Sequence, residues 1–121
     1  MGMRFEDLKA WQMARQLVAQ VYEMAKHAGL ARDFGLRDQL QRAAVSVMTN
    51  IAEGFERTGV SEKAQFYNIA RASCGEVRSL LYVVEDTLPA LAERVVELRR
   101  LSDDTGRLIS GLMNSTQKRQ I

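Results

Sequence analysis

The chain has 121 residues, of which 46% are hydrophobic, with a formal net charge of +2, one proline and a single cysteine. This length suits one domain, residues 1–121, that can bury a core of its own. A single cysteine excludes an intramolecular disulfide and a cysteine-based zinc site, and it suits the reducing environment of the cytoplasm, where we expect the protein.

The sequence also argues against a membrane role. No apolar run approaches the roughly 20 residues that a spanning helix needs. The first eleven residues, MGMRFEDLKAW, carry charges where a signal peptide would need an apolar segment. We therefore expect neither a secretion signal nor a membrane partner.

Two helices are expected in the first half of the chain. The first covers about residues 6–28 and is followed by Gly29, a natural stop. Its apolar residues recur at spacings of three and four, which is the pattern of one buried helix face: Leu8, Trp11, Ala14, Leu17, Val18, Val21, Tyr22 and Ala25. The second covers about residues 36–57, with Gly59 as a candidate C-terminal cap.

Two more helices are expected in the second half. The third covers about residues 62–87, with Ser61 as its N-cap. Its apolar positions repeat at spacings of four and three, like the seam of a coiled coil: Phe66, Ala70, Ser73, Val77, Leu80 and Val84. The fourth covers about residues 90–113 after Pro89, with a potential kink at residues 103–106, and residues 114–121 are expected to fray.

Four long helices joined by short links predict an all-α fold, an antiparallel up-down-up-down four-helix bundle.

The sequence contains few residues that could carry out catalysis in such a bundle. The only histidine, His27, has no second histidine with which to form a di-iron motif, and Cys74 has no local base beside it. No glycine-rich phosphate loop is present. We therefore expect no enzyme activity, no catalytic residue, no metal ligand and no cofactor.

A polar stripe on the second helix is the most informative feature of the sequence. The stripe consists of Arg42, Ser46, Thr49, Asn50, Glu53 and Arg57. Its Ser, Thr and Asn side chains are short and form helices poorly, where a merely solvated face would tend to carry Lys, Glu, Gln or Arg. Three interpretations remain open. The stripe is a solvated face, a contact with another helix or subunit, or a ligand or phosphate site.

Three segments resemble one known family. Residues 5–14, FEDLKAWQMA, match its opening pattern, and residues 34–54, FGLRDQLQRAAVSVMTNIAEG, match its long central signature almost throughout. A shorter element ending in Ser73 and Glu76 also matches, with Ala72 where the family usually has glycine. On these motifs the chain resembles the 23S rRNA-intervening-sequence proteins, also called S23-type ribosomal proteins.

The resemblance implies a four-helix bundle that assembles into a ring-shaped homo-oligomer, a pentamer. It also suggests the interpretation of the polar stripe as a subunit seam, formed by Arg42, Ser46, Thr49, Asn50, Glu53, Ser73 and Glu76. The related accessory proteins of diversity-generating retroelements are similar in fold, and they bind a reverse transcriptase and nucleic acid through basic surface.

Two functional hypotheses follow. Thirteen of the 17 basic residues are arginine, which suits bidentate contact with phosphate. The leading hypothesis is a non-enzymatic oligomer that binds RNA, preferably structured RNA, or DNA through Arg37, Arg57, Lys63, Arg71 and Arg78. Tyr67 is the one aromatic residue interleaved with these, so base stacking gains little support. The alternative is an adaptor ring that docks a larger enzyme, such as a reverse transcriptase, without nucleic-acid affinity of its own.

Overall fold

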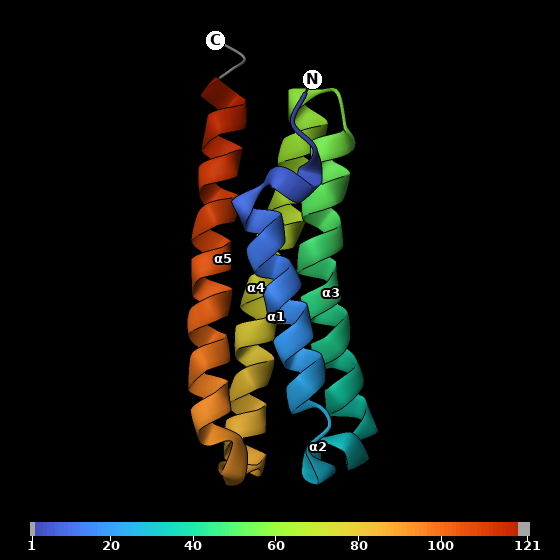
Figure 1. Cartoon of the computed structure of the whole chain (residues 1–121), viewed down its shortest axis with the longest axis vertical. Coiled ribbons are helices and arrows are strands. Elements are labelled where there is room, and N and C mark those ends of the chain that lie inside the picture. Colours follow the sequence, from blue (N-terminus) through green and yellow to red (C-terminus); the bar gives the residue numbers. More distant parts are fainter. Residues whose placement is uncertain (1, 119–121) are drawn as a thin grey trace.

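A computed structural model describes residues 2–118, and within that range every regular element is a helix (Figure 1). The chain is therefore all-α, as expected. Four long helices form the body of the molecule, and three short segments connect or precede them. In chain order the elements are η1 (Phe5–Asp7), α1 (Lys9–Met24), α2 (Ala28–Arg32), α3 (Phe34–Glu56), α4 (Val60–Thr87), η2 (Pro89–Leu91) and α5 (Ala92–Lys118).

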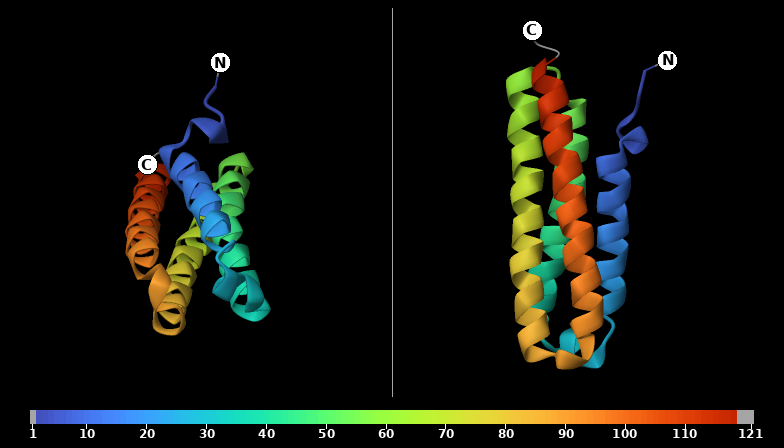
Figure 2. Two further views of the ribbon diagram at one scale, coloured as in Figure 1. Left: turned by 60° about the horizontal axis from the view of Figure 1, so that its bottom comes forward. Right: turned by 90° about the vertical axis from the view of Figure 1, so that its left-hand side faces the viewer.

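The four long helices pack side by side, each running opposite to its neighbours (Figures 1 and 2). α3 packs against α1 and α4, and α5 packs against α4 and α1. α1 therefore lies diagonally opposite α4, and α3 lies diagonally opposite α5. Because the links are short, this order follows the chain, as in an up-down-up-down bundle.

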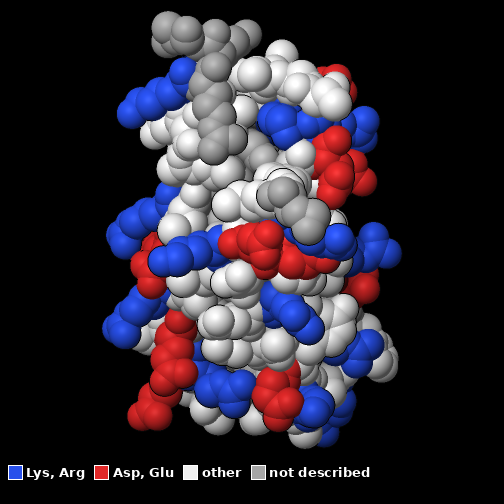
Figure 3. All heavy atoms as spheres, turned by 45° about the horizontal axis from the view of Figure 1, so that its top comes forward, with Lys and Arg blue, Asp and Glu red and all other residues white. Residues whose placement is uncertain are grey.

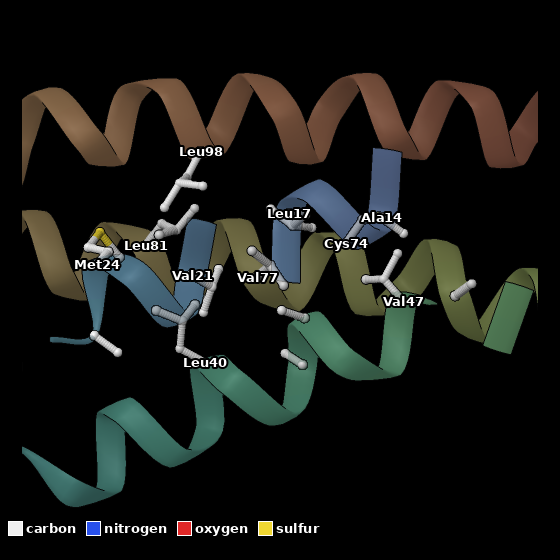
Figure 4. Packing of buried hydrophobic residues seen from close by; sticks show 14 of the residues in the cluster. Ala14, Leu17, Val21, Met24, Leu40, Val47, Cys74, Val77, Leu81 and Leu98 are labelled. Atoms are coloured by element: carbon white, nitrogen blue, oxygen red, sulfur yellow. The ribbon is translucent and has the colours of Figure 1, made fainter. Parts of the chain in front are cut away.

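The core lies between the four helices (Figure 4). The spacings of three and four seen in the sequence put one apolar stripe of each helix there. α1 contributes Leu17 and Val21, α3 contributes Leu40 and Val47, and α4 contributes Val77, all with no exposed surface. Burying a side chain of this size stabilises the fold by about 1.5–3 kcal/mol, so the stripes hold the bundle together without a disulfide.

The first helix is shorter than the sequence predicted. α1 ends at Met24 rather than near residue 28, and a separate short helix, α2, begins at Ala28. His27 lies between them in an extended conformation, and its Nδ1 accepts a hydrogen bond from the backbone N–H of Gly29 at 3.2 Å. The apolar periodicity continues to Ala25, so it gave no sign that the chain turns here.

The last helix is longer than the sequence predicted, and it has no break. α5 runs without a break through residues 103–106, where the sequence allows a kink, and residues 114–118 continue the helix instead of fraying. Ser102 and Thr105 are buried, and the Ser102 hydroxyl donates to the carbonyl oxygen of Cys74 on α4 at 3.0 Å. The Ser102 bond therefore ties α5 to α4 next to the residues of weakest helix propensity, and the Thr105 hydroxyl donates to Leu101 within α5. Residues 119–121 lie outside the described range.

The connection from α3 to α4 also differs in detail. Gly59 is the N-cap of α4 rather than the C-terminal cap of α3, and its φ of −83° and ψ of 140° are ordinary extended values. Ser61, the expected N-cap, lies within the first turn of α4. The carbonyl oxygens that end α3 are instead bound by Lys63, whose Nζ lies 2.7 Å from the oxygen of Phe55 and 3.3 Å from that of Gly54.

Candidate nucleic-acid interface

The polar stripe on α3 contains a hydrogen-bonded cluster that joins α3 to α4. The hydroxyl groups of Ser46 on α3 and Ser73 on α4 lie 2.8 Å apart. The Asn50 amide donates to the carbonyl oxygen of Ser46 at 2.8 Å and to its hydroxyl oxygen at 3.0 Å. Since the Ser46 hydroxyl accepts from Asn50, its own proton is available for Ser73. Three residues of the expected subunit seam therefore meet within one chain.

The other four seam residues lie on the exposed side of this cluster. Arg42 forms an ion pair with Asp38 one turn earlier at 3.1 Å, and Glu53 pairs with Arg57 at 3.1 Å. The Thr49 hydroxyl donates to the carbonyl oxygen of Val45. Glu76 is exposed on α4. These polar side chains face solvent in the single chain, where they are open to a second copy.

The end of this α3–α4 contact explains one glycine of the central signature. A Cβ atom on Gly54 would lie 2.6 Å from Cε1 of Tyr67 and 3.2 Å from Cβ of Phe66. The ring of Tyr67 therefore occupies the space that any larger residue at position 54 would need. Tyr67 is only 1% exposed, so the one aromatic residue that interleaves with the basic residues in the sequence is part of the core.

Three of the five expected nucleic-acid contacts lie at the ends of the bundle, where each binds groups that end or begin a helix. Arg37 donates to the carbonyl oxygen of Ala31 at 2.9 Å. Arg57 pairs with Glu53 and Glu62 and stacks on Phe66. Lys63 binds the last carbonyl oxygens of α3, as described above. If these side chains bound phosphate, they would have to give up the hydrogen bonds and ion pairs that they form at the helix ends.

The remaining two expected contacts, Arg71 and Arg78, line one groove between α4 and α5. The groove has a volume of about 720 Å³ and is open to solvent along one side. Figure 2 shows the two helices lying side by side along their length. We call it the α4–α5 groove, and define it by its lining residues Asn68, Arg71, Ala72, Gly75, Arg78, Asp103, Gly106, Arg107, Ser110, Gly111 and Asn114.

Small residues line the middle of the α4–α5 groove. Gly75 and Ala72 line it from α4, and Gly106, Ser110 and Gly111 line it from α5. No atom of a neighbouring residue lies within 4 Å of a Cβ built on Gly111. A bound molecule can therefore approach the helix backbones closely here, between longer side chains on both sides.

The longer side chains of the α4–α5 groove are mostly cationic. Arg71 donates to Ser110 at 3.5 Å and to Asn68 at 3.2 Å, and it forms no ion pair with any carboxylate of residues 2–118. Arg78 pairs with Asp103 at 3.3 Å. Sequence reasoning missed Arg107, which lines the groove from α5 and pairs with Asp104 at 3.2 Å. Three arginines thus face one lining aspartate.

The face of the molecule shown in Figure 3 carries mixed charge. On the face shown in Figure 3, Lys and Arg side chains alternate with Asp and Glu side chains. Several ion pairs join neighbouring turns of one helix, such as Glu23 with Lys26 at 2.9 Å. The Lys26 ammonium lowers the pKa of Glu23, and that carboxylate stays charged. Such mixed surface gives a polyanion little net attraction.

The described residues offer little to catalysis. Cys74 is fully buried, and burial raises the pKa of its thiol to about 11, so it is protonated at neutral pH. Among residues 2–118, no three His, Cys, Asp or Glu side chains are grouped so that they could hold a metal ion. In the same range, no helix combines the length and the apolar character needed to cross a membrane.

Comparison with known proteins identifies the family of the chain and a solved structure with the same fold. The family model of the 23S rRNA-intervening sequence protein matches residues 6–111. A crystal structure from Bacteroides thetaiotaomicron VPI-5482, described as a protein with unknown function from the S23 ribosomal protein family, has a TM-score of 0.79 and 16% sequence identity. The match covers 86% of this chain and 97% of that one, and at this identity it shows a shared fold alone. No curated protein matches. The chain belongs to the family of 23S rRNA-intervening sequence proteins.

Proposed function

We propose that this protein is a non-enzymatic, cytoplasmic RNA-binding protein that holds phosphate groups in the α4–α5 groove. The observation that carries the proposal is the convergence of Arg71, Arg78 and Arg107 on one groove with a glycine-rich lining. A guanidinium group presents its N–H donors in a planar fork that matches a phosphate. The small residues between the arginines let a phosphodiester backbone approach both helices.

The charges in the groove are partly neutralised, which fits reversible binding. Arg71 is bound only by neutral oxygens and is the most available cation. Arg78 and Arg107 each share a carboxylate at the surface, where such pairs contribute only about 0–1 kcal/mol. A phosphate can replace these carboxylates at little cost. The contacts read no base, so binding of structured RNA and of DNA is expected to depend on salt more than on sequence.

Assembly would strengthen this weak site. We propose that copies of the chain form a ring-shaped homo-oligomer, a pentamer, through the exposed residues beside the Ser46–Ser73 cluster. Five chains of net charge +2 would present five grooves to one RNA molecule. Linked sites on one partner raise the overall affinity well above that of a single groove.

A second candidate function is a protein-docking ring without nucleic-acid affinity, whose partner is a larger enzyme such as a reverse transcriptase. The observation in its favour is the exposed apolar surface of α4, where Ile69 is 42% and Val83 is 44% exposed. Mixed charge on the visible face agrees with it. Larger apolar patches rimmed by polar residues mark protein interaction sites, and a ring would bring several copies of these residues together.

One experiment separates the two functions. A fluorescently labelled RNA hairpin is titrated with the wild type, with an Arg71→Gln/Arg78→Gln variant, and with an Arg15→Gln/Arg32→Gln control. The control removes the same charge from exposed positions of α1 and α2. RNA binding predicts a clear loss of affinity in the groove variant and a much smaller loss in the control. Equal affinities would contradict the proposed site, and no binding by the wild type would favour the docking ring.

A further inference from the structure

An exposed tyrosine lies at one end of the α4–α5 groove. Arg71, Gly75, Arg78 and Tyr82 follow one another on α4 at spacings of four, three and four, so they share one face of the helix. Tyr82 is 55% exposed, the largest exposed fraction of any tyrosine in the described range. It therefore continues the line of the two arginines by one further turn.

The aromatic ring is held in place from the other side of the groove. The guanidinium carbon of Arg99 on α5 lies 4.3 Å from the centroid of the Tyr82 ring. Glu85 forms an ion pair with Arg99 and fixes the guanidinium in this position. Arg99 lies one turn before Asp103, which pairs with Arg78. Tyr82 and Arg99 thus form a cation–π pair that bridges α4 and α5 at the end of the groove, with more than half of the tyrosine open to solvent.

The dimensions of the groove suit one strand rather than two. Neighbouring helix axes lie about 8–10 Å apart, so the space between two adjacent ridges is only about one chain wide. Arg71 and Arg78 are seven residues apart, or about 10 Å along the helix. This spacing is longer than one nucleotide, so the two arginines can contact different phosphates of one strand. A duplex could touch only the edges of the groove.

We infer that the α4–α5 groove takes an unpaired segment of RNA, with phosphates at Arg71 and Arg78 and one base stacked on the Tyr82–Arg99 pair. This inference rests on the proposed function and names the form of RNA that the same site accepts. Loops and bulges of a structured RNA supply such segments, and their bases are free to stack on aromatic and guanidinium planes. Stacking tolerates any base, so the site has little sequence preference.

The test uses three labelled probes of matched length: an unpaired oligouridylate, an abasic ribose-phosphate strand and a blunt RNA duplex. Tyr82→Leu is expected to weaken oligouridylate binding by about 5- to 150-fold, the range that one stacked base contributes. Binding of the abasic strand should not change, since it has phosphates but no base. Tyr82→Phe keeps the ring and should restore the affinity for oligouridylate.

The matched control is Tyr22→Leu. Tyr22 is also exposed, at 45%, but it lies on α1, diagonally opposite α4. A second variant, Gly111→Leu, fills the groove without changing its charge, and it should weaken oligouridylate more than duplex. Gly111 is exposed with open space around it, so the larger residue does not disturb the core.

The outcomes distinguish this inference from the proposed function. If the duplex and the abasic strand bind but Tyr82→Leu binds oligouridylate as tightly as Tyr22→Leu, phosphate binding stands and the stacking site is wrong. If oligouridylate binds no more tightly than the abasic strand, the stacking site is also wrong. If none of the three probes binds the wild type at low salt, both proposals fail together.

Discussion

The hydroxyl groups of Ser46 and Ser73 meet at 2.8 Å across the contact between α3 and α4. Both residues belong to motifs of the family, and Asn50 from the central motif donates to Ser46 as well. The short polar residues that form helices poorly are therefore placed where two helices approach and exchange hydrogen bonds. This contact accounts for part of the polar stripe without a second subunit.

The hydrogen bond predicts coupling between the two serines. Ser46→Ala and Ser73→Ala should each lower the free energy of unfolding by about 1 kcal/mol, because each leaves a half-buried hydroxyl without one partner. The double variant should lose about 0.5–1.5 kcal/mol less than the sum of the two single losses. Urea unfolding of the four proteins measures this difference, and purely additive losses would show that the bond contributes nothing.

Gly54→Ala should destabilise the protein by about 1–3 kcal/mol, because the new methyl group overlaps the ring of Tyr67. Gly111→Ala is the matched control within another helix, where open space surrounds the added Cβ. It should stabilise the protein by about 0.5–1 kcal/mol, the ordinary gain of alanine over glycine in a helix. The two shifts in thermal midpoint should therefore have opposite signs. A stabilising Gly54→Ala would mean that α3 and α4 separate readily.

Asn50→Leu tests the proposed assembly. The half-buried amide lies at the edge of the α3–α4 contact, next to the exposed seam residues. If a second copy packs there, the leucine should lower the mass of the protein in solution while its helix content is retained. Gln39→Leu adds the same apolar group to an exposed position of α3 and should leave the mass unchanged. Light scattering after gel filtration gives both masses, and a native mass for Asn50→Leu would remove this residue from the seam.

Cys74 predicts a loss of stability in alkaline solution. Burial raises the pKa of its thiol from 9.0 to about 11, so the unfolded chain releases this proton at a lower pH than the folded chain does. The stabilising effect is therefore complete below about pH 9 and is lost as the pH rises through about 11. Cys74→Ala removes this contribution, which amounts to about 3 kcal/mol for the rise of the pKa from 9.0 to about 11. Unfolding free energies at pH 8 and 10.5 should fall more in the wild type than in the variant, and parallel falls would contradict the burial argument.

The spacing of apolar residues predicted the four long helices well, because each helix of a bundle buries one apolar stripe. It did not predict the end of α1 at Met24, because Ala25 continues the apolar pattern into the turn that His27 forms with Gly29. Nor did it predict that α5 extends to Lys118. The weak propensity of residues 103–106 is offset by contacts with α4, and such contacts between helices are absent from a local pattern.

The candidate interface was harder to predict, because it depends on which helices are neighbours. The charge of Arg71 and Arg78 is visible in the sequence, whereas Arg107 joins them only because α5 packs beside α4. Tyr82 was missed and Tyr67 was noted instead, although Tyr67 is in the core. The repeat of Arg71, Gly75, Arg78 and Tyr82 on one face of the third predicted helix was the available signal.

The most direct test of phosphate binding in the α4–α5 groove is the salt dependence of RNA affinity. The affinity of the wild type and of Arg71→Gln/Arg78→Gln for one RNA hairpin is measured over a series of salt concentrations, with the mass of the protein recorded in each buffer. We predict a linear fall of log affinity with log salt, and a slope that is smaller by about two in the variant at the same mass. Equal slopes for the two proteins, or no RNA binding by the wild type at low salt, would contradict phosphate binding in the α4–α5 groove.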